Sequence, residues 1–85
     1  MTLYLYSIKD KLRDFDGVMT ILDDQNAERI FEGFCKKQAA MEYVSPRYFE
    51  LYKVGELETE TGVVKGYAKQ EIKLLKEGEQ YEQKA

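Results

Sequence analysis

Residues that commonly carry out catalysis are scarce in this sequence of 85 residues, which has one cysteine and no histidine. Without histidine, a Ser-His-Asp triad, a Cys-His pair and an imidazole metal site are all excluded. Cys35 follows Phe31 and Phe34 on an apolar stripe, so we interpret it as a small buried hydrophobe, with a reactive thiol as the alternative. We therefore expect a protein that is not an enzyme and that needs no cofactor.

Aspartates are the second group of candidate chemical residues. Asp14, Asp16, Asp23 and Asp24 could in principle gather around a divalent cation. However, the run 14–17 lacks the remaining spaced ligands of a calcium-binding loop. We interpret these aspartates as solvated loop and helix-cap residues, and the sequence predicts no metal site.

Tyrosines and lysines form a third pattern, in which aromatic strand residues lie beside basic ones. Such rings can stack on the bases of single-stranded nucleic acid while lysines contact its phosphates. Tyrosine is also an ordinary strand residue, so cross-strand packing is the simpler interpretation from residue types alone. The candidate nucleic-acid-binding residues are Tyr4, Tyr6, Lys9, Lys11, Arg13, Tyr52, Lys53 and Lys65.

The elements that must position these residues begin with a strand. Residues 2–8 alternate with a period of two and are largely apolar on both faces, which indicates a central strand or an edge covered by a partner. Residues 9–17 are charged and end in glycine, which favours a loop. Residues 18–22 form a short apolar run, either a second strand or an extended entry into a helix.

Residues 24–40 carry the clearest signal, the 3.6-residue period of an amphipathic helix. Either Asp23 or Asp24 can cap its first turn. The apolar stripe that we expect to face the sheet consists of Ala27, Ile30, Phe31, Phe34 and Cys35.

The second half of the chain predicts a hairpin. Residues 48–55 read as a long strand, 58–62 as a turn and 63–67 as the returning strand, while 68–77 fit either a short helix or a further strand. We predict a single α+β domain over residues 1–78, followed by a polar tail, 79–85. Its fold is a small antiparallel sheet of three or four strands packed against one amphipathic helix, in the order β(β)αββ.

Charge and cysteine content limit the possible partners and the compartment. The net charge is −3, from 13 basic and 16 acidic side chains, whereas a domain that neutralises many phosphates carries a basic excess. The lone cysteine suits a reducing compartment. The apolar start of the chain is too short for a signal peptide or a membrane span, so we expect a cytoplasmic protein with no membrane partner.

Three segments resemble the small nonstructural protein of gokushoviruses, which are single-stranded DNA bacteriophages of the microvirus family. Residues 3–11, Leu-Tyr-Leu-Tyr-Ser-Ile-Lys-Asp-Lys, are similar to its start, and residues 24–31 resemble the beginning of its helix. The strongest similarity is in residues 46–57, Pro-Arg-Tyr-Phe-Glu-Leu-Tyr-Lys-Val-Gly-Glu-Leu, followed by Glu-Thr-Gly at 60–62. Residues 18–22 and the chain after Tyr67 depart from the family's pattern.

The resemblance implies a phage accessory protein, the product of the fifth open reading frame, that works in the host bacterial cytoplasm and is absent from the mature capsid. That family is described as acting in viral single-stranded DNA synthesis or as DNA-binding, and it supplies no catalytic residues. The resemblance also adds Phe49 to the aromatic positions of interest.

Two hypotheses follow from these observations. The first is an accessory protein of single-stranded DNA synthesis or packaging that binds single-stranded DNA by stacking and a few lysines. The second is a protein–protein adaptor, a homodimer, that engages a phage or host replication protein. The discriminating feature is whether the basic residues converge on one face, namely Lys9, Lys11, Arg13, Lys65 and Lys69.

Overall fold

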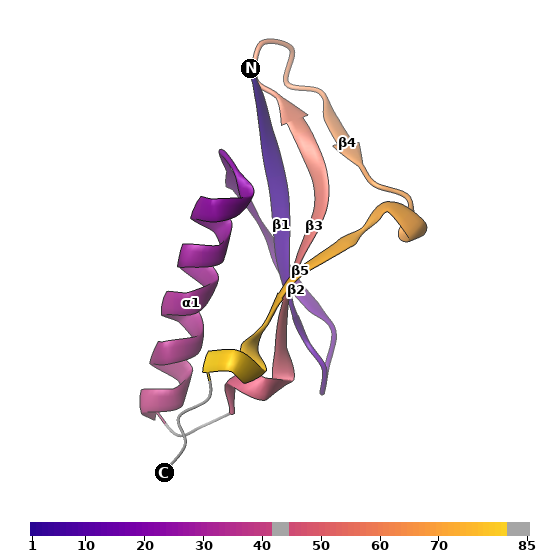
Figure 1. Cartoon of the computed structure of the whole chain (residues 1–85). Helices are drawn as coiled ribbons and strands as arrows, with labels where there is room; N and C mark the ends of the chain where they lie inside the picture. The colour runs from indigo at the N-terminus through magenta and orange to yellow at the C-terminus, as the bar shows by residue number, and fades with distance from the viewer. Residues whose placement is uncertain (42–44, 82–85) are drawn as a thin grey trace.

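The computed structural model describes residues 1–41 and 45–81, which form one α-helix and five strands (Figure 1). The strands are β1 (Thr2–Asp10), β2 (Phe15–Ile21), β3 (Phe49–Glu58), β4 (Val64–Gly66) and β5 (Lys73–Glu77), and α1 spans Asp24–Met41. Short 3-10 turns lie at Pro46–Tyr48, Lys69–Glu71 and Gly78–Tyr81. The predicted α+β class and element order are confirmed, with five strands instead of three or four.

All strand pairs are antiparallel, and β1 lies in the interior of the sheet, between β2 and β3. The other edge of β3 is shared by two short strands. β4 pairs with Gly55–Leu57, near the end of β3, and β5 pairs with Glu50–Lys53, near its start. The central position of β1 explains why its sequence is apolar on both faces.

Several predicted loops and boundaries shift. β1 continues to Asp10 and β2 starts at Phe15, so the predicted loop at 9–17 shrinks to a four-residue turn. The run 18–22 is a strand that ends at Ile21, and the strand alternative holds for residues 73–77. Gly62 has a φ of 77°, as expected for the turn before β4.

Helix α1 begins where Asp23 accepts a hydrogen bond from the backbone N–H of Asn26 (2.8 Å). The row formed by Ala27, Phe31 and Cys35 is fully buried against the sheet. The prediction was wrong for Ile30, which is 48% exposed. At 100° per residue, Ile30 lies about 100° from the centre of that row, beyond the reach of the sheet.

The core is small and lies between α1 and one side of the sheet. Its buried hydrophobic residues are Tyr6, Ala27, Phe31, Cys35, Phe49 and Leu51. The last 3-10 turn packs against it, with the rings of Tyr81 and Phe31 edge to face at 6.1 Å. The packed part of the chain therefore extends past the predicted end at residue 78; residues 42–44 and 82–85 lie outside the described part.

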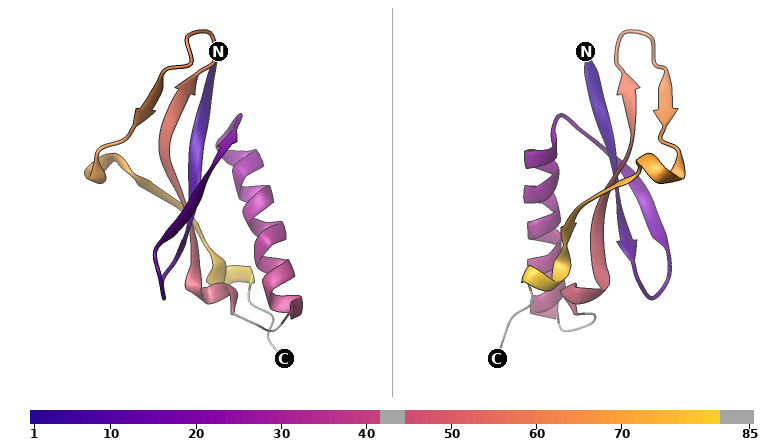
Figure 2. Two further views of the ribbon diagram at one scale, coloured as in Figure 1. Left: turned by 180° about the vertical axis from the view of Figure 1, so that it is seen from behind. Right: turned by 45° about the vertical axis from the view of Figure 1, so that its right-hand side comes forward.

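Helix α1 covers one side of the sheet, and among the described residues no helix covers the other (Figure 2). A bulge places Gly17 and Val18 opposite Ser7, and Gly17 adopts a φ of 67° there. We call the side opposite α1 the uncovered face. Its residues, from strand pairing and alternation, are Leu3, Leu5, Ser7, Lys9, Phe15, Val18, Thr20, Glu50, Tyr52, Val54, Leu57, Val64, Leu74 and Glu77.

Candidate functional site

The predicted nucleic-acid-binding residues fall on both sides of the sheet. Tyr4, Tyr6 and Lys53 lie on the side of α1, because they alternate with residues of the uncovered face and contact the helix start. Lys9 and Tyr52 belong to the uncovered face. The structure therefore divides the proposed base-stacking platform between two opposite surfaces.

On the helix side, three of these residues are joined to Asp24 in one cluster. The Tyr6 hydroxyl donates a hydrogen bond to Asp24 Oδ1 (2.7 Å), and Lys53 Nζ lies 3.1 Å from the same oxygen. Lys53 Nζ also lies 3.7 Å from the centroid of the Tyr4 ring, a cation–π contact. The cluster fastens the start of α1 to the middle of β1 and β3.

The pKa values in this cluster follow from burial and charge. Burial, then the hydrogen bond to Asp24 and its negative charge, raise the pKa of Tyr6 far above its usual value near 10. Burial alone would raise the pKa of Asp24, but the hydrogen bonds from Tyr6 and Lys53 lower it below its usual value. The Tyr6 ring is fully buried, so it has no surface for stacking on a base. The burial of Tyr6 argues against its predicted role in binding nucleic acid.

On the uncovered face, Lys9 and Tyr52 meet around Phe15. The Phe15 and Tyr52 rings contact edge to face at 5.2 Å, and Lys9 Nζ lies 5.6 Å from the Phe15 centroid. The Tyr52 hydroxyl donates a hydrogen bond to Glu50 Oε1 (3.2 Å). Among residues 1–41 and 45–81, this cluster is the one place where a predicted aromatic and a predicted lysine lie together at an exposed ring, that of Phe15.

Of the remaining basic residues, Lys11 adjoins that cluster through Glu50, whereas Lys65 lies far from it. Lys11 and Arg13 lie in the β1–β2 turn, and Lys11 Nζ is 4.0 Å from Glu50 Oε2. Lys65 of β4 lies opposite Glu56 of β3, on the helix side. Lys9 lies opposite Glu50, six residues earlier in β3. At about 3.3 Å per residue, this separates Lys9 and Lys65 by roughly 20 Å. The basic residues are scattered, which favours the second hypothesis.

The most extensive unexplained feature is the apolar character of the uncovered face. Four of its large apolar side chains are strongly exposed, namely Phe15 (45%), Val18 (61%), Val64 (61%) and Leu74 (40%). They come from β2, β4 and β5, so the apolar surface crosses most of the sheet. A hollow of about 280 Å³ opens on it, lined by Ser7, Phe15, Gly17, Val18, Val54 and Ile72.

The sequence did not indicate this apolar face, because Phe15 falls within residues 9–17, for which a loop is expected. The signal that could have found it is the alternation of β1, where Leu3 and Leu5 are apolar on the side that α1 does not cover. A central strand that is apolar on both faces needs cover on both. One helix supplies cover for one face only.

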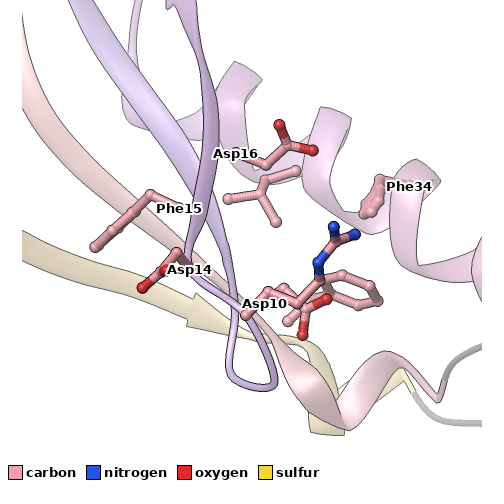
Figure 3. A pocket seen from close by; sticks show the side chains of 8 residues that line it. Asp10, Asp14, Phe15, Asp16 and Phe34 are labelled. Carbon is pink, nitrogen blue, oxygen red and sulfur yellow. The ribbon is translucent and has the colours of Figure 1, made fainter.

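A second hollow, of about 430 Å³, lies between the β1–β2 hairpin and α1 (Figure 3). The hairpin contributes Asp10, Asp14 and Asp16, and Phe34 approaches from the helix. Asp23 lies beyond the other end of β2, where Ile21 pairs with Tyr4. The four aspartates considered in the sequence therefore do not lie together. Among residues 1–41 and 45–81, no group of three or more acidic or cysteine side chains is placed to hold a metal ion.

Cys35 is fully buried, and burial raises the pKa of its thiol to about 11. At pH 8 we expect a thiol-specific reagent to modify the folded protein at least about 100-fold more slowly than the urea-unfolded chain, because the thiolate is both rare and enclosed. The rate of colour release from an aromatic disulfide reagent measures this. Equal rates in the two states would instead establish Cys35 as a reactive thiol.

In the described part of the chain, no helix combines the length and the apolar character needed to cross a membrane. Comparison with known proteins gives no match among curated proteins or solved structures. A model of the family described as phage ORF5 protein matches residues 3–80, nearly the whole chain. The match includes all three segments that carried the resemblance and extends it through β5. The chain therefore belongs to the phage ORF5 protein family.

Proposed function

We propose that this phage protein is a non-enzymatic accessory of viral single-stranded DNA synthesis or packaging that acts by binding protein. The observation that carries the proposal is the uncovered face, where β2, β4 and β5 expose large apolar side chains and where Phe15 and Val18 of β2 line a hollow. Contiguous apolar surface of this kind marks a contact site, since isolated exposed hydrophobes are ordinary but a continuous sheet face is not. The link to single-stranded DNA replication rests on the resemblance to gokushovirus proteins.

The charges on the uncovered face support protein over nucleic acid. Its strands carry one lysine, Lys9, and two glutamates, Glu50 and Glu77, and Lys11 of the β1–β2 turn pairs with Glu50. A surface without a basic excess attracts phosphates weakly, and aliphatic residues such as Val18 and Leu74 offer a base little to stack on. Apolar packing against a protein surface needs neither a basic groove nor aromatic rings.

A second candidate function, binding single-stranded DNA directly, is favoured by one observation. The exposed Phe15 ring and the half-buried Tyr52 ring form an aromatic pair, with Lys9 above the Phe15 ring. Such a group can stack on one or two bases, each worth about 1–3 kcal/mol. The Tyr4, Tyr6 and Lys53 cluster on the other side adds nothing to it, because it is engaged with Asp24.

Fluorescence anisotropy of a labelled oligothymidine separates the two candidates. We expect no saturable binding at physiological salt, because the basic residues do not form a continuous path for the phosphates. Saturable binding that weakens with salt and is lost in Tyr52→Ala would replace our proposal with the DNA-binding function. Circular dichroism confirms that the variant is folded.

Affinity capture among co-expressed phage replication and packaging proteins tests the protein-binding function directly. The bait is the tagged chain, and the test variant is Val18→Asp, which places a charge on the uncovered face. Val63→Asp is a matched control, because Val63 is equally exposed (61%) but lies beside Thr2 and Lys65 on the other side. A partner retained by the wild type and the control and lost by Val18→Asp supports the proposal; capture that ignores both substitutions contradicts it.

A further inference from the structure

We infer that the uncovered face is the interface of a symmetric dimer, in which the sheets of two copies of this chain pack face to face. The inference rests on the proposed function: the protein that covers this surface is a second copy of the chain, and a phage protein that binds the same surface must displace that copy. It begins from the exposed side chains Phe15, Val18, Val64 and Leu74 and from the hollow beside them.

The area of the face matches what a stable dimer needs. Four strands lie side by side across most of the sheet, and the longest, β3, has ten residues. With strands about 4.8 Å apart and a rise of about 3.3 Å per residue, the residues of the five strands cover roughly 540 Å² on this face. Two copies would together bury about 1,100 Å², which clears the roughly 1,000 Å² expected of a biological interface.

The total accessible surface, summed over the whole chain, is also larger than that of a typical monomer. The chain exposes 5885 Å² for a mass of 10.0 kDa. Folded monomers of this mass expose about 5,200 Å². The excess, roughly 600–700 Å², is close to the area that one copy would bury in the dimer.

The shape of the face fits a second copy of itself. Two sheets pack at a spacing of about 10 Å when the side chains of their inner faces interdigitate. This face has both parts of such a contact: Val18 and Leu74 protrude from it, and the hollow of about 280 Å³ can accept an apolar side chain. In a two-fold interface each copy supplies the protrusion for the hollow of the other.

Two hydroxyl groups on the face already have hydrogen-bond partners within the chain. The Ser7 hydroxyl donates a hydrogen bond to the backbone oxygen of Gly17 (2.6 Å), and the Tyr52 hydroxyl donates one to Glu50. These groups keep their partners when water leaves, so their burial leaves no unmade hydrogen bond. Lys9 and the two glutamates lie together near the start of β3, where both signs of charge are present in each copy.

The small core gives a further reason for association. Among the residues whose burial the structure describes, six hydrophobic ones are buried, and they all lie on the helix side. Chains of this size commonly gain the missing buried area by oligomerising. A dimer would enclose β1 and β3 on both faces, as their two-sided apolar sequences require.

Sedimentation equilibrium over a range of concentrations tests the inference on the full chain. We expect the wild type and Val63→Asp to sediment as dimers of twice 10.0 kDa. Val18→Asp should dissociate at least about 30-fold more readily, the effect of losing one interface hot spot. Leu74→Lys, on a different strand, is the second test variant, and circular dichroism verifies that each variant is folded.

A wild type that stays monomeric at all concentrations overturns the inference, as does a dimer that both substitutions leave unchanged. These outcomes are distinct from failure of the proposed function. If the chain is monomeric but captures a phage protein in a way that depends on Val18, the symmetric dimer is refuted and the proposed function stands. If the chain is dimeric but captures no phage protein, the binding of a phage protein is refuted and the dimer stands.

Discussion

Replacing Phe31 by alanine is expected to lower the free energy of unfolding by about 3–5 kcal/mol, the usual cost of removing a buried aromatic ring. Phe31 is fully buried at the centre of the helix–sheet contact, and its ring also contacts Tyr81 of the last 3-10 turn. A domain of this size has only about 5–15 kcal/mol of stability in total. Phe31→Ala should therefore bring the protein close to its unfolding threshold.

Urea unfolding followed by circular dichroism at one fixed protein concentration measures the loss, since a dimer would make stability concentration-dependent. The matched control is the neighbouring residue, Ile30→Ala. Its side chain is 48% exposed, so we expect a cost of about 1 kcal/mol or less. Equal losses for the two variants would show that α1 is rotated relative to the orientation described above.

The comparison of these two neighbours also shows what helical periodicity can predict. The stripe from Ala27 to Cys35 located the helix and its buried side, because apolar residues recur every three or four positions. It could not separate Phe31 from Ile30, because which edge of a stripe is buried depends on how the helix sits on the sheet. That orientation is set by contacts distant in sequence, such as those that join Asp24 to Tyr6 and Lys53.

The alternation of apolar residues in strands also predicted some features of the fold and missed others. It predicted β1, and the two apolar faces of β1 indicated either a central strand or an edge covered by a partner, of which the structure shows the central strand. It could not assign Phe15 to a strand, because the bulge at Gly17 and Val18 breaks the period of two. The hydrogen bond between Tyr6 and Asp24 could not be predicted from the sequence either, since it joins residues 18 positions apart. The uncovered face depends on these features, so the main candidate surface emerged only with the fold.

Gly78→Ala is expected to destabilise the protein by about 3 kcal/mol, at the upper end of the usual cost of overpacking. Gly78 is buried where the last 3-10 turn crosses the turn at Pro46–Tyr48. A Cβ atom at residue 78 would overlap the backbone oxygen of Pro46 and lie 3.0 Å from that of Phe49. Both neighbours are backbone atoms, which cannot rotate away as a side chain would.

Because the two turns cannot separate without moving Tyr81 away from Phe31, the substitution should also loosen the end of the chain. Hydrogen exchange of the amides in residues 73–81, alongside urea unfolding, measures both effects. Gly66→Ala is the matched control, since a Cβ atom there meets no atom within 4 Å and the stability change should stay within about 0.5 kcal/mol. If Gly78→Ala proves as stable as Gly66→Ala, the 3-10 turn does not dock on Pro46, and the packed part of the chain ends with β5.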